Sequence, residues 1–245
     1  MAAPEVLLEN SDEVYEYYLR HRQNRIQALA AYAILGRRFH PRISYADGAK
    51  EQLKSLVASG RRLVISVNHL SEKDPYTLAA AAWRSPLRPI IGKVRVLAKD
   101  ELFIDPKQRR RVEMMGAIPV FRGKNHGVRA VSAAGQQMMD VCATRMSRGD
   151  DLAIFPEGTI NHEDVSQVQP IGSGIGHIVF RARKLGVEPA LLFVGLSYGP
   201  NGEDVKSASY YFGNPITEFP TKPAEITRLV KEHMQDALDG AVKLY

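Results

Sequence analysis

A histidine and an aspartate separated by four residues, His69 and Asp74, carry the clearest chemical signal in the chain. They follow the apolar run Leu63–Val67, which is typical of a buried strand. Asp74 precedes Pro75, and proline favours a first helical turn, so we expect a helix to begin here. A carboxylate that holds an imidazole fixes its tautomer and raises its basicity, as a general base acting on a hydroxyl requires. A loop histidine followed by a helix-capping aspartate has the same spacing, so the pair alone leaves both interpretations open.

Two other apolar runs also end in polar residues. Ala117–Phe121 leads to Arg122, and Leu152–Phe155 leads to Pro156–Thr159, which supplies a carboxylate, a glycine and a hydroxyl. Ligands of open parallel sheets bind outside the carboxyl ends of the strands, so neighbouring strands would bring these groups to one cleft. The planar fork of an arginine suits phosphate, and Lys99 adds a positive charge. The set predicts a site for a phosphorylated alcohol.

Strands and helices are expected to alternate along most of the chain. The further predicted strands are Ile90–Gly92, Ala117–Phe121, Leu152–Phe155 and Ala190–Leu196, with Ala208–Phe212 nearer an edge. The predicted helices are Pro75–Arg84, Pro106–Met115, Val128–Arg148, Ile175–Leu185 and Pro223–Leu238. This alternation predicts an α/β fold: a single domain, residues 41–245, with a mostly parallel sheet flanked by helices.

An N-terminal helical segment, residues 1–40, is expected to precede that domain as one long helix from about Asn10 to Phe39. Its apolar part, Ile26–Gly36, is far shorter than the ~20 residues that span a membrane. Arginines flank this part, and tyrosines are interspersed before and within it. Two interpretations stay open: a helix lying in the plane of a membrane surface, or an amphipathic helix packed on the domain.

The charge balance favours anionic partners. The 245-residue chain has 33 Lys and Arg against 27 Asp and Glu, a net charge of +6, which suits nucleic acid, anionic lipid or a phosphate-rich ligand such as coenzyme A. No nucleic-acid-binding module is recognisable, so nucleic acid is not expected. The single cysteine, Cys142, excludes an intramolecular disulfide, fits a reducing compartment and is expected in the core. Since no signal-peptide pattern opens the chain, we expect a cytoplasmic protein.

Several blocks in fixed order resemble a known family. Asn68–Asp74 (Asn-His-x4-Asp), Gly116–Arg122 and Phe155–Thr159 are similar to the signature blocks of the glycerolipid acyltransferases related to 1-acylglycerol-3-phosphate (lysophosphatidic acid) acyltransferase. Lys99–Phe103 resembles the family's Lys-x-Glu-Leu stretch, and Gly213–Ile216 matches its Gly-x-Pro-Ile. The combination is far more specific than any one block.

The resemblance implies an acyltransferase domain over residues 41–245, with His69 as catalytic base and Asp74 as its partner. It implies that the acceptor is bound by Arg122, Glu157, Gly158 and Thr159, to which Lys99 adds a positive charge. The implied reaction moves a fatty acyl group from acyl-CoA or acyl carrier protein to the free hydroxyl of a lysophospholipid, with lysophosphatidic acid as first candidate. No cofactor is expected. Direct attack is expected because the chain has no Gly-x-Ser-x-Gly nucleophile motif.

Two departures from the family pattern concern substrate choice. Ile160 occupies the place where many members have an arginine, which removes one possible phosphate contact. The run Leu191–Leu196 lacks the proline of the family's Val-Pro-Val turn, which alters a wall thought to shape acyl binding.

Two alternatives belong to other functional classes. A catalytically silent lipid-binding protein of the same fold would work at a membrane surface. A metal-dependent phosphoester hydrolase would also use His, Asp and Glu, and Asn161–Asp164 offers adjacent ligands, but this loop lacks any zinc-type spacing, so no metal is expected. The leading interpretation is a peripheral enzyme at the inner face of the membrane.

Overall fold

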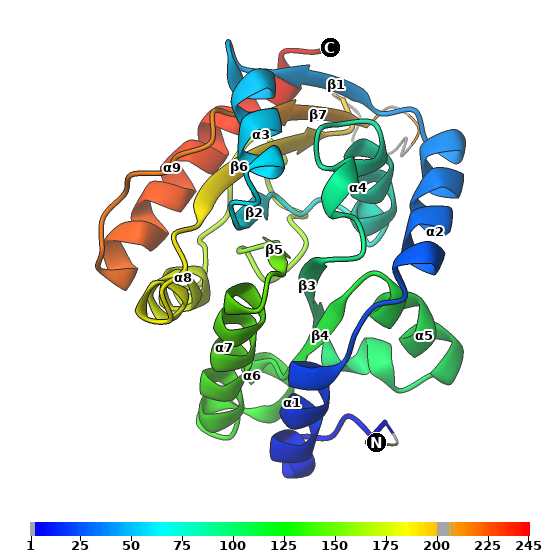
Figure 1. Cartoon of the computed structure of the whole chain (residues 1–245), viewed down its shortest axis with the longest axis vertical. Coiled ribbons are helices and arrows are strands. Elements are labelled where there is room, and N and C mark those ends of the chain that lie inside the picture. The colour runs from blue at the N-terminus through cyan, green and yellow to red at the C-terminus, as the bar shows by residue number, and fades with distance from the viewer. Residues whose placement is uncertain (1–2, 200–205, 207) are drawn as a thin grey trace.

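A seven-stranded sheet in the order β1-β7-β6-β2-β5-β3-β4 forms the centre of the described part of the molecule (Figure 1). The computed structural model describes residues 3–199, 206 and 208–245. Five neighbouring strands, β6 to β4 in this order, are parallel, whereas β7 is antiparallel to β6 and parallel to β1. The strands are β1 Arg42–Tyr45, β2 Leu63–Val67, β3 Val94–Lys99, β4 Ala117–Val120, β5 Asp151–Ile154, β6 Ala190–Ser197 and β7 Ser209–Phe212. The predicted α/β class and the largely parallel sheet are confirmed.

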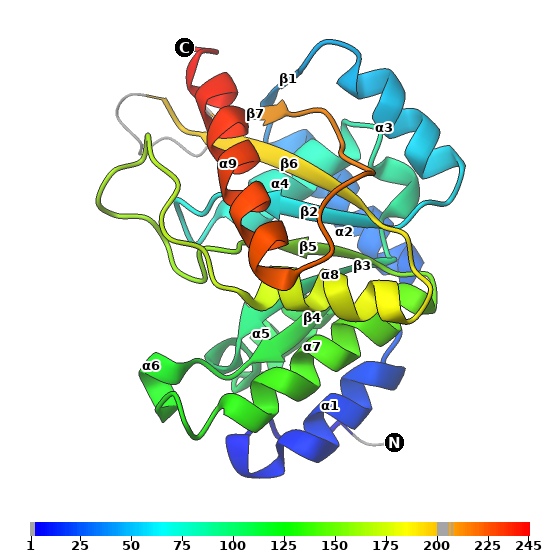
Figure 2. The ribbon, with the colours of Figure 1, turned by 90° about the vertical axis from the view of Figure 1, so that its left-hand side faces the viewer.

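Helices cover both faces of the sheet. Figure 2 shows α7, α8 and α9 crossing in front of the strands, with α2, α3 and α4 behind them. The helices are α1 Ser11–Arg20, α2 Arg25–Arg38, α3 Ala49–Ala58, α4 Asp74–Trp83, α5 Pro106–Met114, α6 Gly123–His126, α7 Ser132–Ser147, α8 Gly174–Lys184 and α9 Pro223–Val242. Short 3-10 turns occupy Leu8–Asn10, Arg88–Ile90 and Asp100–Phe103.

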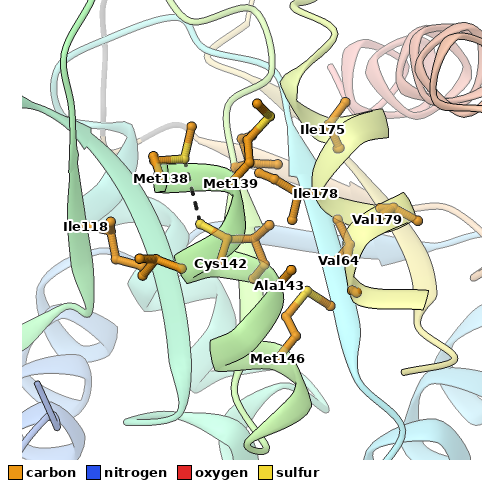
Figure 3. Packing of buried hydrophobic residues seen from close by; sticks show 14 of the residues in the cluster. Val64, Ile118, Met138, Met139, Cys142, Ala143, Met146, Ile175, Ile178 and Val179 are labelled. Atoms are coloured by element: carbon orange, nitrogen blue, oxygen red, sulfur yellow. Dashed lines mark hydrogen bonds between the residues drawn. The ribbon is translucent and has the colours of Figure 1, made fainter. Parts of the chain in front are cut away.

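Two apolar cores result from the alternation of side chains along the strands. Val64 of β2 packs with α7 and α8 on one face, whereas Leu63 and Ile65 pack with α3 and α4 on the other. Figure 3 shows the first core, where Cys142 lies buried among apolar side chains with its Sγ 3.8 Å from the sulfur of Met138. Burial raises the pKa of the Cys142 thiol to about 12, so the expected core position is confirmed and the thiol is unreactive at neutral pH.

The predicted long N-terminal helix is wrong in one respect, because it divides into α1 and α2. The Asn24 side chain accepts from the Gln27 amide and so caps α2 at its start. The end of α1 is held by tertiary contacts, since the Leu19 carbonyl accepts from Arg145 (3.1 Å) and Arg148 (3.0 Å). Neither proline nor glycine marks this break, which explains why the sequence pattern concealed it.

A buried charged cluster fixes the link between α1 and α2. Arg95 is 2% exposed and donates to Asp150 (2.7 Å) and to the His21 carbonyl (3.0 Å). Arg145 donates to the same carboxylate at 2.7 Å. Because a buried charge requires pairing, this cluster holds the N-terminal helices against the sheet.

The predicted strand at Ile90–Gly92 is also wrong. These residues end a 3-10 turn, and Gly92 has φ +84°, a left-handed backbone that interrupts extended structure. The strand of this region is β3, which begins two residues later. Three other elements, β1, α3 and α6, were not predicted, because each is short and at most partly buried.

Three tyrosines of the N-terminal helices are core residues, and Tyr17 is half-buried. Tyr15 and Tyr18 of α1 are buried against the α7 side of the sheet, and Tyr32 of α2 is buried against α4. The three buried tyrosines are therefore not the interfacial aromatics that a membrane-surface helix would present. Among the described residues, no helix combines the length and apolar character needed to cross a bilayer.

The helix α9 approaches β6 closely at Gly195. A Cβ on this residue would lie 1.9 Å from the carbonyl oxygen of Ala237, so only glycine fits without moving α9. We expect Gly195→Ala to lower the free energy of unfolding by about 3 kcal/mol, measured by chemical denaturation. The matched control is Gly135→Ala on α7, where a Cβ meets nothing within 4 Å and should stabilise by about 0.5–1 kcal/mol. Equal effects in the two variants would contradict this account.

Candidate active site

His69 and Asp74 form the predicted hydrogen-bonded pair. His69 Nδ1 lies 2.8 Å from Asp74 Oδ2, and this oxygen also accepts from the amides of Leu70 (2.6 Å) and Ser71 (2.9 Å). The Asp74 side chain is fully buried, whereas the His69 side chain is 18% exposed. Because an ionised carboxylate only accepts, the pair assigns the proton to Nδ1 and leaves the lone pair on Nε2. Asp74 begins α4, so the predicted helix start is confirmed.

Neighbouring strands hold the imidazole in place. The side chain of Asn68 donates to the Leu196 carbonyl (2.9 Å) and accepts from its amide (2.7 Å), which ties the end of β2 to β6. The ring of Phe155 stacks on that of His69, with centroids 4.3 Å apart and planes inclined by 16°. The catalytic candidate thus lies between two strands with one ring nitrogen oriented by Asp74.

The side chain of Glu157 accepts hydrogen bonds from backbone amides of two segments. Its Oε1 accepts from the His69 amide (2.8 Å) and its Oε2 from the Gln169 amide (3.0 Å). Burial raises the pKa of the Glu157 carboxyl, although the His69 and Gln169 amides oppose that shift. Both oxygens are therefore already engaged in fixing the loop after β5 against the loop after β2. The role implied by the family, binding of the acceptor, stays a prediction.

The other two residues of the third block lie at the surface. Gly158 has φ +67°, a conformation that favours glycine, and it turns the chain just after Glu157. Thr159 is exposed. The loop continues through Asn161, whose amide donates to the His69 carbonyl at 2.8 Å.

The Asn161 side chain organises its own loop. Its Nδ2 donates to the carbonyls of Asp164 (2.6 Å) and Gln167 (2.8 Å), and its Oδ1 accepts from the Glu163 amide (3.1 Å). Both polar atoms of the Asn161 side chain are therefore hydrogen-bonded to the backbone of the loop. In the part of the chain that the structure describes, no group of three potential ligands is placed to hold a metal ion.

The two candidate phosphate-binding cations lie at the same edge of the sheet and already contact carboxylates. Lys99 Nζ lies 3.4 Å from Glu72, which belongs to the loop between His69 and Asp74. Arg122 Nη2 donates to both oxygens of Glu101 at 2.7 and 3.1 Å. The Nε of Arg122 is buried and has no hydrogen-bond partner among the described residues. An anion that entered would therefore meet one unpaired donor and two exchangeable ion pairs.

The parallel sheet brings all these groups to one edge. The loops after β4 and β5 both extend to the left in Figure 2, at the carboxyl ends of the strands. In strand order β2 and β4 are three spacings apart, which at about 4.8 Å each is roughly 14 Å. His69 and Arg122 therefore follow the two outer strands of this set of four, while Glu157 follows β5 and Lys99 ends β3, the two strands between them.

An apolar cavity of about 120 Å³ begins beside the pair. Phe155, which stacks on His69, and Pro75, which follows Asp74, belong to its lining. It continues between α4 and the sheet past Leu78 and Val96 and reaches Tyr32 of α2. This cavity accepts a flexible hydrocarbon better than a polar group.

The comparison with known protein families decides the class. The family model described as Acyltransferase matches residues 48–193, well over half of the chain. The chain belongs to the glycerolipid acyltransferase family. The matched range contains the His-Asp pair, both cations and the whole third block of this acyltransferase. None of the curated proteins matches the chain significantly.

One residue near the pair escaped the sequence analysis. Tyr198 directly follows β6 and donates to Asp74 Oδ1 at 2.6 Å. Its position at the carboxyl end of a parallel strand is the signal that singled out the other candidates. The sequence separation of 124 positions between the two partners hid the contact.

The double hydrogen bond of Glu157 generates a test of its role. In Glu157→Gln the NH2 group of the new side chain replaces one of the two accepting oxygens. It must then face a backbone N–H, so that backbone donor loses its acceptor. We expect a loss of about 1–3 kcal/mol in the free energy of unfolding, and faster hydrogen exchange at the amides of His69 and Gln169. Glu163→Gln changes an exposed carboxylate of the same loop and is the matched control. Identical exchange rates in both variants would contradict the clamp.

Proposed function

We propose that this acyltransferase moves a fatty acyl group from an acyl thioester to the free hydroxyl of a lysophospholipid, with lysophosphatidic acid as first candidate. The observation that carries the proposal is the His69–Asp74 hydrogen bond, 2.8 Å long, beside an apolar cavity whose lining includes Pro75 and Phe155. Nε2 of His69 removes the hydroxyl proton while the oxygen attacks the thioester carbonyl. The carbon–sulfur bond then breaks, and the thiolate leaves and takes up a proton. A positioned base contributes roughly 10²–10⁴ in rate, and orientation of the two substrates adds to this.

Lys99 and Arg122 are the proposed binders of the acceptor phosphate. In this proposal the phosphate displaces Glu72 from Lys99 and Glu101 from Arg122, or binds these cations together with the two carboxylates. A doubly charged anion attracts a guanidinium more strongly than one carboxylate does. The buried, unpaired Nε of Arg122 supports the assignment. Gly158 and Thr159 are proposed to meet the glycerol part, since they are the exposed end of the third block.

The cavity between α4 and the sheet is the proposed place of the acyl chain. Its lining is apolar and includes Phe155, so an acyl chain that occupied it from this end would have its thioester carbonyl beside His69. The run Leu191–Leu196 that departs from the family pattern lies within β6, whose residues are all buried. The donor is proposed to be acyl-CoA or acyl carrier protein, and no cofactor is required.

We further propose that α2 touches the membrane surface, with the protein peripheral at the inner face. Ile26 and Ile34 are 80% and 66% exposed and lie two turns apart on one side of α2. Arg25, Arg37 and Arg38 are exposed at the two ends of the helix. An apolar stripe between basic ends suits an anionic lipid surface. Because α2 also lines the cavity through Tyr32, lipid would lie near the acyl site.

An acyl-transfer assay tests the reaction. Purified protein is incubated with acyl-CoA or acyl carrier protein, with and without lysophosphatidic acid and chelator, and thiol release is measured. We expect release that requires the acceptor, resists chelator and falls at least 10²-fold in His69→Ala. His162→Ala, which removes an exposed histidine nearby, should retain full activity.

Other outcomes of that assay identify the rivals. Release of inorganic phosphate that chelator abolishes would indicate a metal-dependent hydrolase. Lipid binding with no thiol release from either donor would indicate a silent lipid-binding protein and overturn the proposed reaction.

Vesicle flotation tests the membrane contact. The double variant Ile26→Ser/Ile34→Ser should bind anionic vesicles roughly tenfold more weakly, because two apolar side chains no longer enter the lipid interface. Leu185→Ser is the matched control, since Leu185 is 51% exposed just after α8, on the opposite face of the sheet. Equal flotation of both variants would refute contact through α2.

A further inference from the structure

The two oxygens of Asp74 have different partners. Oδ2 faces His69 and the loop amides, whereas Oδ1 accepts a short hydrogen bond of 2.6 Å from the Tyr198 hydroxyl. Tyr198 is 4% exposed, so water does not compete for this contact. Burial, together with the Asp74 charge, raises the pKa of the Tyr198 hydroxyl, which keeps it protonated and able to donate. The carboxylate is thus held from both sides.

The Tyr198 hydroxyl belongs to a buried network of hydroxyl groups. Thr77 Oγ1 lies 3.1 Å from it and 2.7 Å from the hydroxyl of Tyr210. The Thr77 hydroxyl also lies within donating distance of the Asp74 backbone carbonyl, at 3.2 Å, so its single proton serves either that carbonyl or Tyr198. In both cases Tyr198 keeps its own proton for Asp74 Oδ1, and the neighbouring hydroxyl groups polarise that bond.

The network joins three elements to the catalytic pair. Thr77 lies one turn after Asp74 on α4, Tyr198 follows β6, and Tyr210 lies on β7. In the antiparallel pairing of β6 and β7, Leu196 is opposite Tyr210, and Tyr198 lies two residues beyond Leu196, so the two tyrosines are diagonal neighbours on one face of the sheet. The antiparallel strand that departs from the parallel pattern therefore supplies a support for Asp74.

We propose that Tyr198 is a positioning residue for the reaction, which fixes Asp74 Oδ1 so that Oδ2 faces His69 and holds Nδ1. The inference rests on the proposed function. Without the hydroxyl, Oδ1 is buried without a donor, and the carboxylate gains freedom to rotate away from the imidazole. The Nε2 lone pair of His69 then no longer points steadily at the acceptor.

The test combines kinetics with a spectroscopic signature that needs no substrate. We expect Tyr198→Phe to lower kcat about tenfold with little change in the KM of either substrate. We also expect the downfield proton resonance of His69 Nδ1–H to shift or broaden. Tyr15→Phe is the matched control: Tyr15 is equally buried, but its hydroxyl donates to the Pro119 carbonyl, away from Asp74. It should leave kcat and the resonance unchanged.

The outcomes separate the proposal from the function on which it rests. If the unmodified protein shows no acyl transfer, the His69 resonance still decides whether Tyr198 positions the pair. Should Tyr198→Phe fail to fold, Thr77→Val removes the next hydroxyl of the network and is expected to move the same resonance less. A resonance in the folded Tyr198 or Thr77 variant that equals that of Tyr15→Phe would overturn the proposal.

Discussion

The candidate site depends on the hydrogen bonds of one buried group, the carboxylate of Asp74. Its four hydrogen bonds come from the imidazole of His69, two amides of the loop and the Tyr198 hydroxyl. A fully buried carboxylate is stable only when its oxygens are occupied by donors. The start of α4, the loop after β2 and the end of β6 therefore have one arrangement that satisfies it. The geometry that orients the His69 imidazole also satisfies this buried charge.

The sequence predicted much of the site because its signals are local. The spacing of His69 and Asp74 placed them on one loop between a strand and a helix. The polar residues after each apolar run lie at one edge because parallel strands end together. Long-range contacts were beyond this reasoning. Tyr198 and Asp74 are distant along the chain, and nothing in either neighbourhood indicates their contact.

Tertiary contacts also explain the errors in the predicted elements. The helix expected from Asn10 to Phe39 ends early because arginines of β3 and α7 bind the carbonyls of Leu19 and His21. Such competition for backbone acceptors leaves no mark at the break itself. Glu157 of the third block is a different case: its acceptor-binding role, implied by the resemblance, stays a prediction, and its two oxygens also accept hydrogen bonds from two backbone amides. A motif residue can contribute to a site by fixing the backbone around it.

The charged cluster around Asp150 has a consequence for how substrate reaches the enzyme. It fixes the turn into α2 from the edge of the sheet opposite to His69, and α2 in turn packs on α4, which carries Asp74. The exposed isoleucines of α2, the cavity wall and the His69–Asp74 pair therefore lie on elements that pack directly against one another. If these isoleucines rest on a bilayer, the depth and tilt of the molecule are set by its own packing. The reacting hydroxyl would then be met at a constant height above the lipid, and substrates would be selected partly by where their hydroxyl lies in the leaflet.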